Sequence, residues 1–596
     1  MSVFCAALSA TDPQCEVEHL GGDAHFFSGP CALGLITGQR SGLESCCFQL
    51  ENHQPLLHVA GSIKLFNRNT LSSELDQQPC YDGEFWLKTY AEHGLAGLCK
   101  LNGMFGAVIW DGNSLSLVSD PVGSRSIFYT RLGDTWLVSA SLRALRQHPR
   151  FSARPNLFAA QAFLVFAYVP GELTLLEGVY RVPPGCCLRL FPDGRSEIER
   201  YWHVHEGEWD LTDPPEAYAT TLRLLLEDAV SQRLPVDQPV GVFLSGGLDS
   251  SLVTALAARL HNQPIHTFTI NFGKQFPNEL NFANAVANQY ATQHHTLTYS
   301  GDEIANHFAA TVSYMDLPVG EGLTVPNLML SRAAAESALR VILNGEGGDP
   351  CFGGPKNIPM LAFELHRQSD LPLERASAYL RSYRHCYDNL PQLLSSDVQQ
   401  TLVSSPPLET LVLPGLHDTS MRYYLNRLMA TNLQLKGAGY MLPKVEALTS
   451  LFGLEARAPL FDRRIVEFSF SVPPQYKLAG TDEKWILKLA TRDLLPRSII
   501  NRPKSGMRMP MQNWLKGPLK RLSKQILFTP AARQRNFFQL STIQTWLECD
   551  GLLWPRHGIH LWLTLTLEAW FQSFIDKTTP EPIPVQPASR HWFNQG

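Results

Sequence analysis

Two patterns of hydrophobic and polar positions follow one another along the chain. Over the first 200 residues, short β-like runs are separated by turns, as in LHVAGSIKLFN at 57–67 and GCCLRLFPDGRSEIERYW at 185–202. Such runs predict short strands. From about Ala217, the spacing of apolar residues becomes helical over long stretches, which are broken by short aliphatic runs such as VGVFL at 240–244. This alternation predicts an α/β arrangement.

The change of pattern predicts two domains. Residues 1–205 form the strand-rich domain and residues 217–575 the α/β domain. The segment between them, 206–216, is acidic and carries paired prolines, as linkers often do. Residues 576–596 are rich in proline and predict an exposed tail.

The motif SGGLDSS at 245–251 lies between the VGVFL run and a predicted helix with Leu252, Leu256 and Leu260 on one face. A turn between a strand and a helix N-terminus binds anions, because unpaired N–H groups and the positive end of the helix dipole point to the same place. Its glycines permit close approach, and its serines add hydroxyl donors. Asp249 repels a bare phosphate, so the loop is expected to bind ATP together with Mg²⁺.

A second glycine-rich turn follows a second short strand. The aliphatic run at 341–343 leads into NGEGGD at 344–349. Ligands bind beyond the carboxyl ends of strands in an open parallel sheet. We therefore expect this turn to face SGGLDSS, with Asp249 and Asp349 sharing the Mg²⁺ ion.

Composition narrows the classes of function. The chain has 596 residues, a net charge of −5 and 44% hydrophobic residues, which is typical of a soluble globular protein. It shows no basic excess for nucleic acid, no apolar run of membrane-helix length and no signal-peptide pattern. The twelve cysteines include no C-x-x-C pair that would indicate a zinc or thioredoxin site. We expect a cytoplasmic enzyme with no nucleic-acid or membrane partner.

These motifs together resemble those of the asparagine synthetases, ATP pyrophosphatases that release AMP and pyrophosphate. SGGLDSS resembles the family's pyrophosphate loop, and HTFTI at 266–270 resembles its adenine-recognising strand. LEARAPLFDRRIVEF at 454–468 is similar to the family's LEVRVPFLD segment, and RPKSGMRMPMQNWLKGP at 502–518 to its RKxGFxxPxxxWLxGP segment.

The resemblance implies a C-terminal parallel-sheet ATP-pyrophosphatase domain, similar to the adenine nucleotide alpha hydrolases. It also implies that Asp249 and Asp349 hold the metal. The implied contacts to ATP and pyrophosphate are Ser245, Gly246, Gly247, Leu248, Asp249, Ser250, Ser251, Thr269 and Gly345.

Two catalytic residues follow from the same resemblance. Lys484, in TDEKWILKLA, stands where the family has a lysine that contacts the reacting phosphate and oxyanion. Glu346 would orient or deprotonate an amine. In the expected mechanism a carboxylate attacks the α-phosphate of ATP, and an amine then attacks the acyl-adenylate to give an amide and AMP.

The N-terminal part resembles the family's glutamine amidotransferase domain, which implies an Ntn-type β-sandwich layered with helices. LNGMFGAVIWD at 101–111 and SDPVGSRSIFY at 119–129 both match. A glutamine-hydrolysing member needs a cysteine directly after the initiator methionine, whereas this chain has Ser2, and Cys5 lies three residues further in. SIKLFN at 62–67 replaces the turn that supplies the oxyanion hole. We therefore expect no glutaminase activity.

This degenerate pattern is similar to the branch of the family that makes other amides, the lasso-peptide cyclases and β-lactam synthetases. Glu346 stands where β-lactam synthetases have a tyrosine, so it fits an asparagine synthetase or a peptide cyclase better. EALT at 446–449 replaces the family's DRMS, and Pro350 replaces an acid. Both changes lie near the expected acid pocket and argue against aspartate as the substrate.

Three hypotheses follow. The first is an amide ligase that joins a small-molecule or peptide carboxylate to an amine without hydrolysing glutamine. The second is an asparagine synthetase using ammonia or, through an unusual nucleophile, glutamine. The third is a non-catalytic homologue with a binding role, which the presence of both acids and Lys484 disfavours. Biosynthetic partner proteins or a homodimer would be compatible with each.

Overall fold

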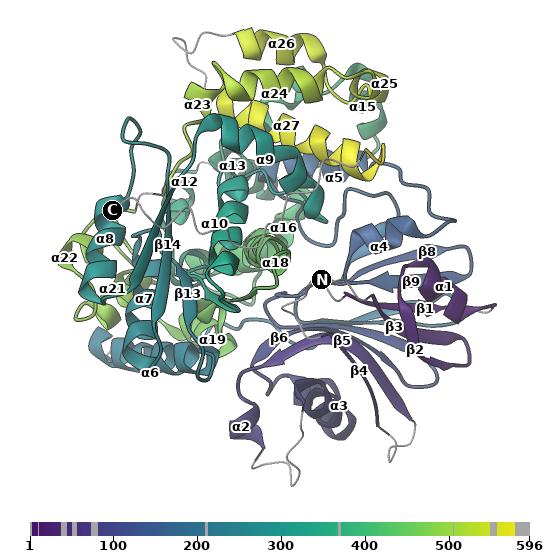
Figure 1. The fold of residues 1–596 in the computed structure, drawn as a ribbon, viewed down its shortest axis with the longest axis horizontal. Coiled ribbons are helices and arrows are strands. Elements are labelled where there is room, and N and C mark those ends of the chain that lie inside the picture. Colours follow the sequence, from purple (N-terminus) through teal and green to yellow (C-terminus); the bar gives the residue numbers. More distant parts are fainter. Residues whose placement is uncertain are drawn as a thin grey trace.

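The computed structural model describes residues 3–9, 11–36, 45–50, 56–72, 81–208, 213–367, 371–504, 506–548 and 557–578. A strand-rich N-terminal part and a mixed C-terminal part lie against each other (Figure 1). The predicted tail lies outside the described residues except for 576–578, and so do residues 209–212 of the predicted linker. The first helix of the C-terminal part, α6 (Pro215–Arg233), begins inside the predicted linker segment.

Two six-stranded antiparallel sheets form the N-terminal part, as expected for a β-sandwich. One sheet has the order β10-β8-β9-β1-β3-β2 and the other β12-β11-β7-β6-β5-β4. Strands of the first sheet are β1 (Val3–Leu8), β2 (Asp23–Ser28), β3 (Cys31–Ile36), β8 (Phe128–Leu132), β9 (Thr135–Ser139) and β10 (Val179–Arg181). Strands of the second are β4 (Ser45–Leu50), β5 (Leu57–Leu65), β6 (Gly103–Trp110), β7 (Leu115–Ser119), β11 (Cys186–Leu190) and β12 (Ser196–Arg200).

Alternation along the strands explains the layers. In β1, Phe4 and Leu8 point into the core between the two sheets, whereas Cys5 and Ala7 point to the other face. That other face is covered by α1 (Pro13–His19), α4 (Leu142–Gln147) and α5 (Leu157–Phe166). The outer face of the second sheet is covered by α3 (Asp82–Leu98), in agreement with the layered arrangement in Figure 1. Because successive side chains of a strand point to opposite faces, one group of apolar side chains lies between the sheets and a second group lies under the helices.

A five-stranded parallel sheet organises the C-terminal part, in the order β15-β14-β13-β16-β17. Its strands are β13 (Val240–Phe243), β14 (Ile265–Asn271), β15 (Gln293–Thr298), β16 (Val341–Leu343) and β17 (Glu455–Arg457). Apolar side chains of both faces are buried, as a parallel sheet requires. One face packs on α6, α7 (Leu248–Leu260) and α8 (Leu280–Gln289), and the other on α9 (Gly301–Tyr314) and α10 (Thr324–Glu336).

The helix after SGGLDSS differs in one detail from its prediction. Leu252 and Leu256 of α7 are buried, but Leu260 is 42% exposed. Leu260 is the last residue of the helix, so its side chain extends past the edge of the sheet instead of onto it.

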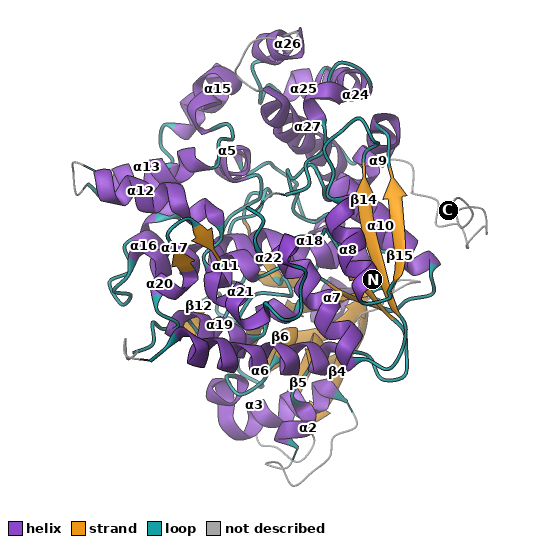
Figure 2. Cartoon of the chain, turned by 90° about the vertical axis from the view of Figure 1, so that its left-hand side faces the viewer, coloured by secondary structure: helices purple, strands orange, loops and turns teal. Residues whose placement is uncertain are grey.

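Further helices extend the C-terminal part. Figure 2 shows a group of helices at the top of the molecule, α15 (Ser396–Leu402), α24 (Pro518–Leu527), α25 (Pro530–Arg535), α26 (Leu540–Glu548) and α27 (His557–Phe574). A continuous run of α17 (Tyr424–Asn432), a π-helical segment (Leu433–Met441) and α18 (Leu442–Ser450) leads to β17. No helix among the described residues is long and apolar enough to cross a membrane.

Polar contacts join the two parts at several points. The Gly320 N–H donates to the Ala167 carbonyl at 2.8 Å. Asn102 donates to the Asp462 carboxylate at 2.7 Å, and that carboxylate also pairs with Arg233 at 2.7 Å. Because this pair is buried and bonded from both parts of the chain, removal of one partner would leave an uncompensated charge.

Candidate active site

The two predicted loops meet at the carboxyl ends of β13 and β16. SGGLDSS connects β13 to α7, and NGEGGD connects β16 to the short helix α11 (Gly348–Phe352). The loops pack so tightly that a Cβ on Gly345 would lie 2.5 Å from the Ser250 nitrogen. Glycine at this position is therefore needed for the approach of the two loops.

The first loop is closed by its own side chains. The Ser250 hydroxyl accepts a hydrogen bond from the Ser245 N–H at 3.1 Å and lies 3.0 Å from the Ser245 hydroxyl. Gly246 has a φ of +76°, which favours glycine, and Gly247 at the helix start has no side-chain cap. The Ser251 hydroxyl is buried with no hydrogen-bond partner among the described residues. Free N–H and O–H groups at the start of α7 form a donor set suited to phosphate oxygens.

Lys484 lies between the two acids predicted to hold a metal. Its Nζ is 2.5 Å from an oxygen of Asp249 and 2.5 Å from an oxygen of Asp349. The Lys484 side chain is 1% exposed. Its backbone has a left-handed φ of 55° just before α21 (Trp485–Thr491). Such a conformation costs a non-glycine residue about 1–3 kcal/mol, and residues in it cluster at functional sites.

A second lysine faces the same two acids. Lys504 Nζ lies 3.4 Å from each carboxylate. Burial raises the pKa of Asp349, but Lys484 and Lys504 outweigh it and bring that pKa well below its usual range. The same two carboxylates outweigh burial at Lys504 and raise the pKa of its ammonium. Asp349 is therefore held ionised, as a ligand of a cation must be.

The residues present fit a divalent cation. The second oxygen of Asp249 is buried and has no hydrogen-bond partner among the described residues. Two carboxylates on facing loops, next to a phosphate-binding helix start, form the oxygen donor set that Mg²⁺ prefers when it also binds nucleotide phosphates.

These groups line one end of a cavity of about 810 Å³. Thr269 of β14 is buried in its wall, and its hydroxyl donates to the Leu244 carbonyl. Thr269 thus joins the first loop to the strand predicted to recognise adenine. On the far wall, Tyr168 stacks on Tyr440 with ring centroids 5.8 Å apart, and Tyr383 lies nearby. Beyond the loops the wall therefore carries aromatic rings together with charged side chains, among them Lys356 and Lys436.

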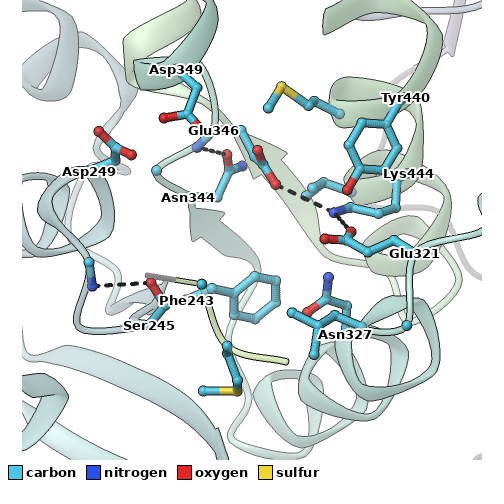
Figure 3. Close-up of a pocket in the computed structure, with 18 of the residues that line it drawn as sticks. Phe243, Ser245, Asp249, Glu321, Asn327, Asn344, Glu346, Asp349, Tyr440 and Lys444 are labelled. Carbon is cyan, nitrogen blue, oxygen red and sulfur yellow. Dashed lines mark hydrogen bonds and ion pairs between the residues drawn. The ribbon is translucent and has the colours of Figure 1, made fainter. Parts of the chain in front are cut away.

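Glu346 lies between Asp349 of the same loop and the pair Lys444 and Glu321, as Figure 3 shows. Its carboxylate is 3.5 Å from Lys444 Nζ, which also pairs with Glu321 at 2.8 Å. Burial opposes the charge of Lys444, but the two glutamates outweigh it and raise its pKa to about 12. The N–H of Glu346 donates to the Asn344 side chain at 3.1 Å, which fixes the loop. Glu346 thus remains at the cavity wall, where it can meet an amine.

Sequence reasoning missed two residues of this cluster, Glu321 and Lys444. Each is distant in sequence from Glu346: Lys444 lies on α18, and Glu321 lies between Gly320 and Gly322 just before α10, a turn that follows no strand of the sheet. The signal present was a lysine in the apolar stretch YMLPKVEAL, which is unusual for a buried helix.

The predicted acid-pocket segment at 446–449 divides between two cavities. Thr449 lines the cavity described above, whereas Glu446 lines a second cavity and pairs with Arg125 at 2.9 Å. Helix α18 forms a wall between them. Glu446, which we expected near the acid pocket, therefore does not line the cavity that holds the two loops. Pro350 is buried in α11, next to Asp349.

Of the two candidate glutaminase nucleophiles, the structure describes only Cys5. Ser2 lies outside the described residues. Cys5 is buried on β1, and burial raises the pKa of its thiol to about 12. Such a thiol is not ionised near neutral pH and is a poor nucleophile. Ser62 and Lys64, in the segment that replaces the oxyanion turn, belong to the regular strand β5.

The fold and site define an ATP-dependent ligase with an amidotransferase-like N-terminal domain. The sequence profile described as asparagine synthase matches residues 221–572, and the profile described as glutamine amidotransferase domain matches residues 45–202. The first match covers more than half of the chain, which therefore belongs to the asparagine synthase family. It is a carbon–nitrogen ligase that uses ATP.

Relatives are similar along most of their length. The chain is 24% identical to glutamine-hydrolysing asparagine synthetase 1 of Bacillus subtilis, over 85% of this chain and 83% of that protein. It is 29% identical to glutamine-hydrolysing asparagine synthetase 3 of the same organism, over 74% of each chain. It is 24% identical to the amidase chyE of Penicillium rubens, over 89% of each chain.

Proposed function

We propose that this ligase adenylates a substrate carboxylate, releases pyrophosphate and transfers the acyl group to an amine that does not come from glutamine. The observation that supports adenylation is the pair Asp249 and Asp349 on facing loops, with Lys484 between them. The observation that supports glutamine independence is Ser2 in the nucleophile position, together with the buried, un-ionised Cys5.

Each group has a role in this chemistry. The donors at the start of α7 bind the β- and γ-phosphates, and Mg²⁺ held by Asp249 and Asp349 would neutralise charge on the departing pyrophosphate. Lys484 stabilises negative charge that develops on the α-phosphate and later on the tetrahedral carbon. Glu346 accepts a proton from the attacking amine, and Lys444 holds the Glu346 carboxylate in the wall. The amide and AMP then leave the cavity.

Two kinds of carboxylic acid are candidates for the substrate that is adenylated. A peptide or secondary-metabolite carboxylate fits the aromatic far wall at Tyr168, Tyr383 and Tyr440, because these rings offer apolar area that a small polar acid would not use. Aspartate with ammonia is the second candidate, favoured by the likeness to proteins named asparagine synthetases.

Glutamine hydrolysis can be measured without knowing the acid. We expect the full chain with ATP and Mg²⁺ to release no glutamate from glutamine above the level of a Ser2→Ala variant. A Cys5→Ala variant serves as the matched control, because it removes the nearest thiol and should also change nothing. Glutamate release that is lost in Ser2→Ala would contradict glutamine independence and identify Ser2 as a working nucleophile.

A further inference from the structure

Three side chains with metal-binding atoms meet where α1 lies beside the end of α4. Glu16 and His19 belong to α1, and His148 directly follows the last residue of α4. Their ligating atoms lie within 4.8 Å of one another. Across the part of the chain that the structure describes, no other three His, Cys, Asp or Glu side chains come this close. We call this group the α1–α4 cluster. None of the roles assigned above to the reaction uses it.

Helical spacing brings a fourth group, the Cys15 thiol, to the same place. Positions three and four residues apart share a helix face, so Glu16 and Cys15 both lie beside His19. The Cys15 Sγ is 3.6 Å from His19 Nε2. Zn–S bonds of about 2.3 Å and Zn–N bonds of about 2.0 Å put neighbouring ligand atoms of a tetrahedral site about 3.3–3.6 Å apart. The Cys15 and His19 atoms already have this separation.

Glu16 and His148 form the buried half of the cluster. They are 8% and 2% exposed, and Glu16 Oε2 lies 2.5 Å from His148 Nε2. The other oxygen of Glu16 accepts a hydrogen bond from Arg150 Nη2 at 2.7 Å. Carboxylates that bind metals are commonly held in this way by a second hydrogen bond. Burial outweighs the effect of Glu16 and lowers the pKa of His148, which favours the neutral imidazole that binds a metal.

Coordination would change the position of one proton. Nδ1 of His148 accepts a hydrogen bond from the Arg150 N–H at 3.3 Å, so Nε2 carries the ring proton and donates it to Glu16. A metal ion at Nε2 moves that proton to Nδ1. The long contact with the Arg150 N–H is then lost. Because Arg150 lies in an exposed turn, its N–H can donate to water instead.

The charge and the ligand types around the cluster favour one kind of cation. Burial and the carboxylates of Asp12, Glu18 and Glu16 raise the pKa of the Cys15 thiol. A bound metal ion reverses this effect, because a coordinating thiol loses its proton. Nitrogen and sulfur ligands with one carboxylate suit Zn²⁺, whereas Mg²⁺ and Ca²⁺ take oxygen ligands. His19 is exposed, so an ion can enter from solvent.

We propose that the α1–α4 cluster and the Cys15 thiol together bind one Zn²⁺ ion. The ion would join α1 to the end of α4. Arg146 of α4 donates to the Ser573 carbonyl of α27, so α4 also takes part in the contact with the C-terminal part. The site is therefore structural, and its loss should lower the stability of the chain.

Titration of the metal-free full chain with Zn²⁺ tests the proposal. Calorimetry should show one ion bound at the cluster, with affinity weakened at least tenfold in His19→Gln and in Cys15→Ser. His19 is exposed and Cys15 is half-buried, so neither substitution should prevent folding. His25→Gln, at an exposed histidine of β2, is the matched control and should bind as the wild type does. Asp249→Asn tests whether Zn²⁺ binds in the reaction cavity instead, and it should also bind as the wild type does.

Co²⁺ serves as a spectroscopic probe, because it occupies tetrahedral sites of the same ligands. The wild type with Co²⁺ should show a thiolate-to-metal absorption band that is absent in Cys15→Ser. Zn²⁺ should raise the melting temperature of the wild type and of His25→Gln, but not that of His19→Gln.

Three results would overturn the proposal: no saturable Zn²⁺ binding by the wild type, equal binding by His19→Gln and the wild type, or no thiolate band with Co²⁺. Each is separable from the proposed ligase function, because these measurements require neither ATP nor turnover.

Discussion

Replacing Asp349 with asparagine is expected to lower AMP formation at least about 10³-fold while the chain still folds. The substitution keeps the shape of the side chain but removes the charge that Lys484 contacts at 2.5 Å and that a divalent cation would need. Asp249→Asn should have an effect of the same size, since Asp249 holds Lys484 at the same distance from the facing loop. Release of AMP, measured by chromatography under saturating ATP, reports the loss.

A matched control separates this effect from a general change of charge. Asp302→Asn removes an acid that is 66% exposed and pairs with Arg521 on the surface. Surface pairs of this kind contribute at most about 1 kcal/mol, so activity should stay unchanged. If Asp349→Asn kept more than a tenth of the wild-type rate, the assignment of the metal-binding acids would be wrong.

Lys484→Met should lower the rate about 10²–10³-fold, the range seen when one preorganised donor to a developing charge is removed. It should also destabilise the chain when no metal is present. The variant leaves the Asp249 and Asp349 carboxylates close together, with Lys504 3.4 Å from each as the remaining nearby cation. Mg²⁺ should therefore raise the melting temperature of Lys484→Met more than that of the wild type.

Lys488→Met is the matched control for Lys484→Met. Lys488 lies one turn further along α21 and pairs with Asp482 at 3.0 Å, away from the two loops. Its loss should leave the rate and the Mg²⁺ response unchanged. A Lys484→Met variant with normal activity would mean that Lys504 alone supplies the positive charge.

Sequence reasoning located the two loops because it needs only local patterns and one topological rule. SGGLDSS and NGEGGD each follow a short buried strand, and parallel strands bring such turns to one edge. The structure places these loops in contact, with Gly345 packed on Ser250. The same rule gave no reason to place Lys484 between the acids, because α21 starts from no strand of the sheet. The resemblance supplied that position.

Contacts between side chains from distant segments of the chain could not be predicted from the sequence. Lys444 lies on α18, Glu321 just before α10 and Glu346 just after β16. They meet because α18 and α10 pack together, and no local spacing encodes that contact. Residues 446–449 show the limit in another way. Glu446 and Thr449 line separate cavities although positions three apart share a helix face, so their spacing alone does not predict which space each side chain lines.

We propose that this site cleaves ATP between the α- and β-phosphates. Phosphorus NMR of ATP, Mg²⁺ and the purified chain, with ammonia and a panel of aspartate and peptide carboxylates, tests it most directly. We expect AMP and pyrophosphate in equal amounts, formed only when an acid is present and absent with Asp349→Asn. Formation of ADP and phosphate with any acid of the panel would contradict adenylation at the paired loops.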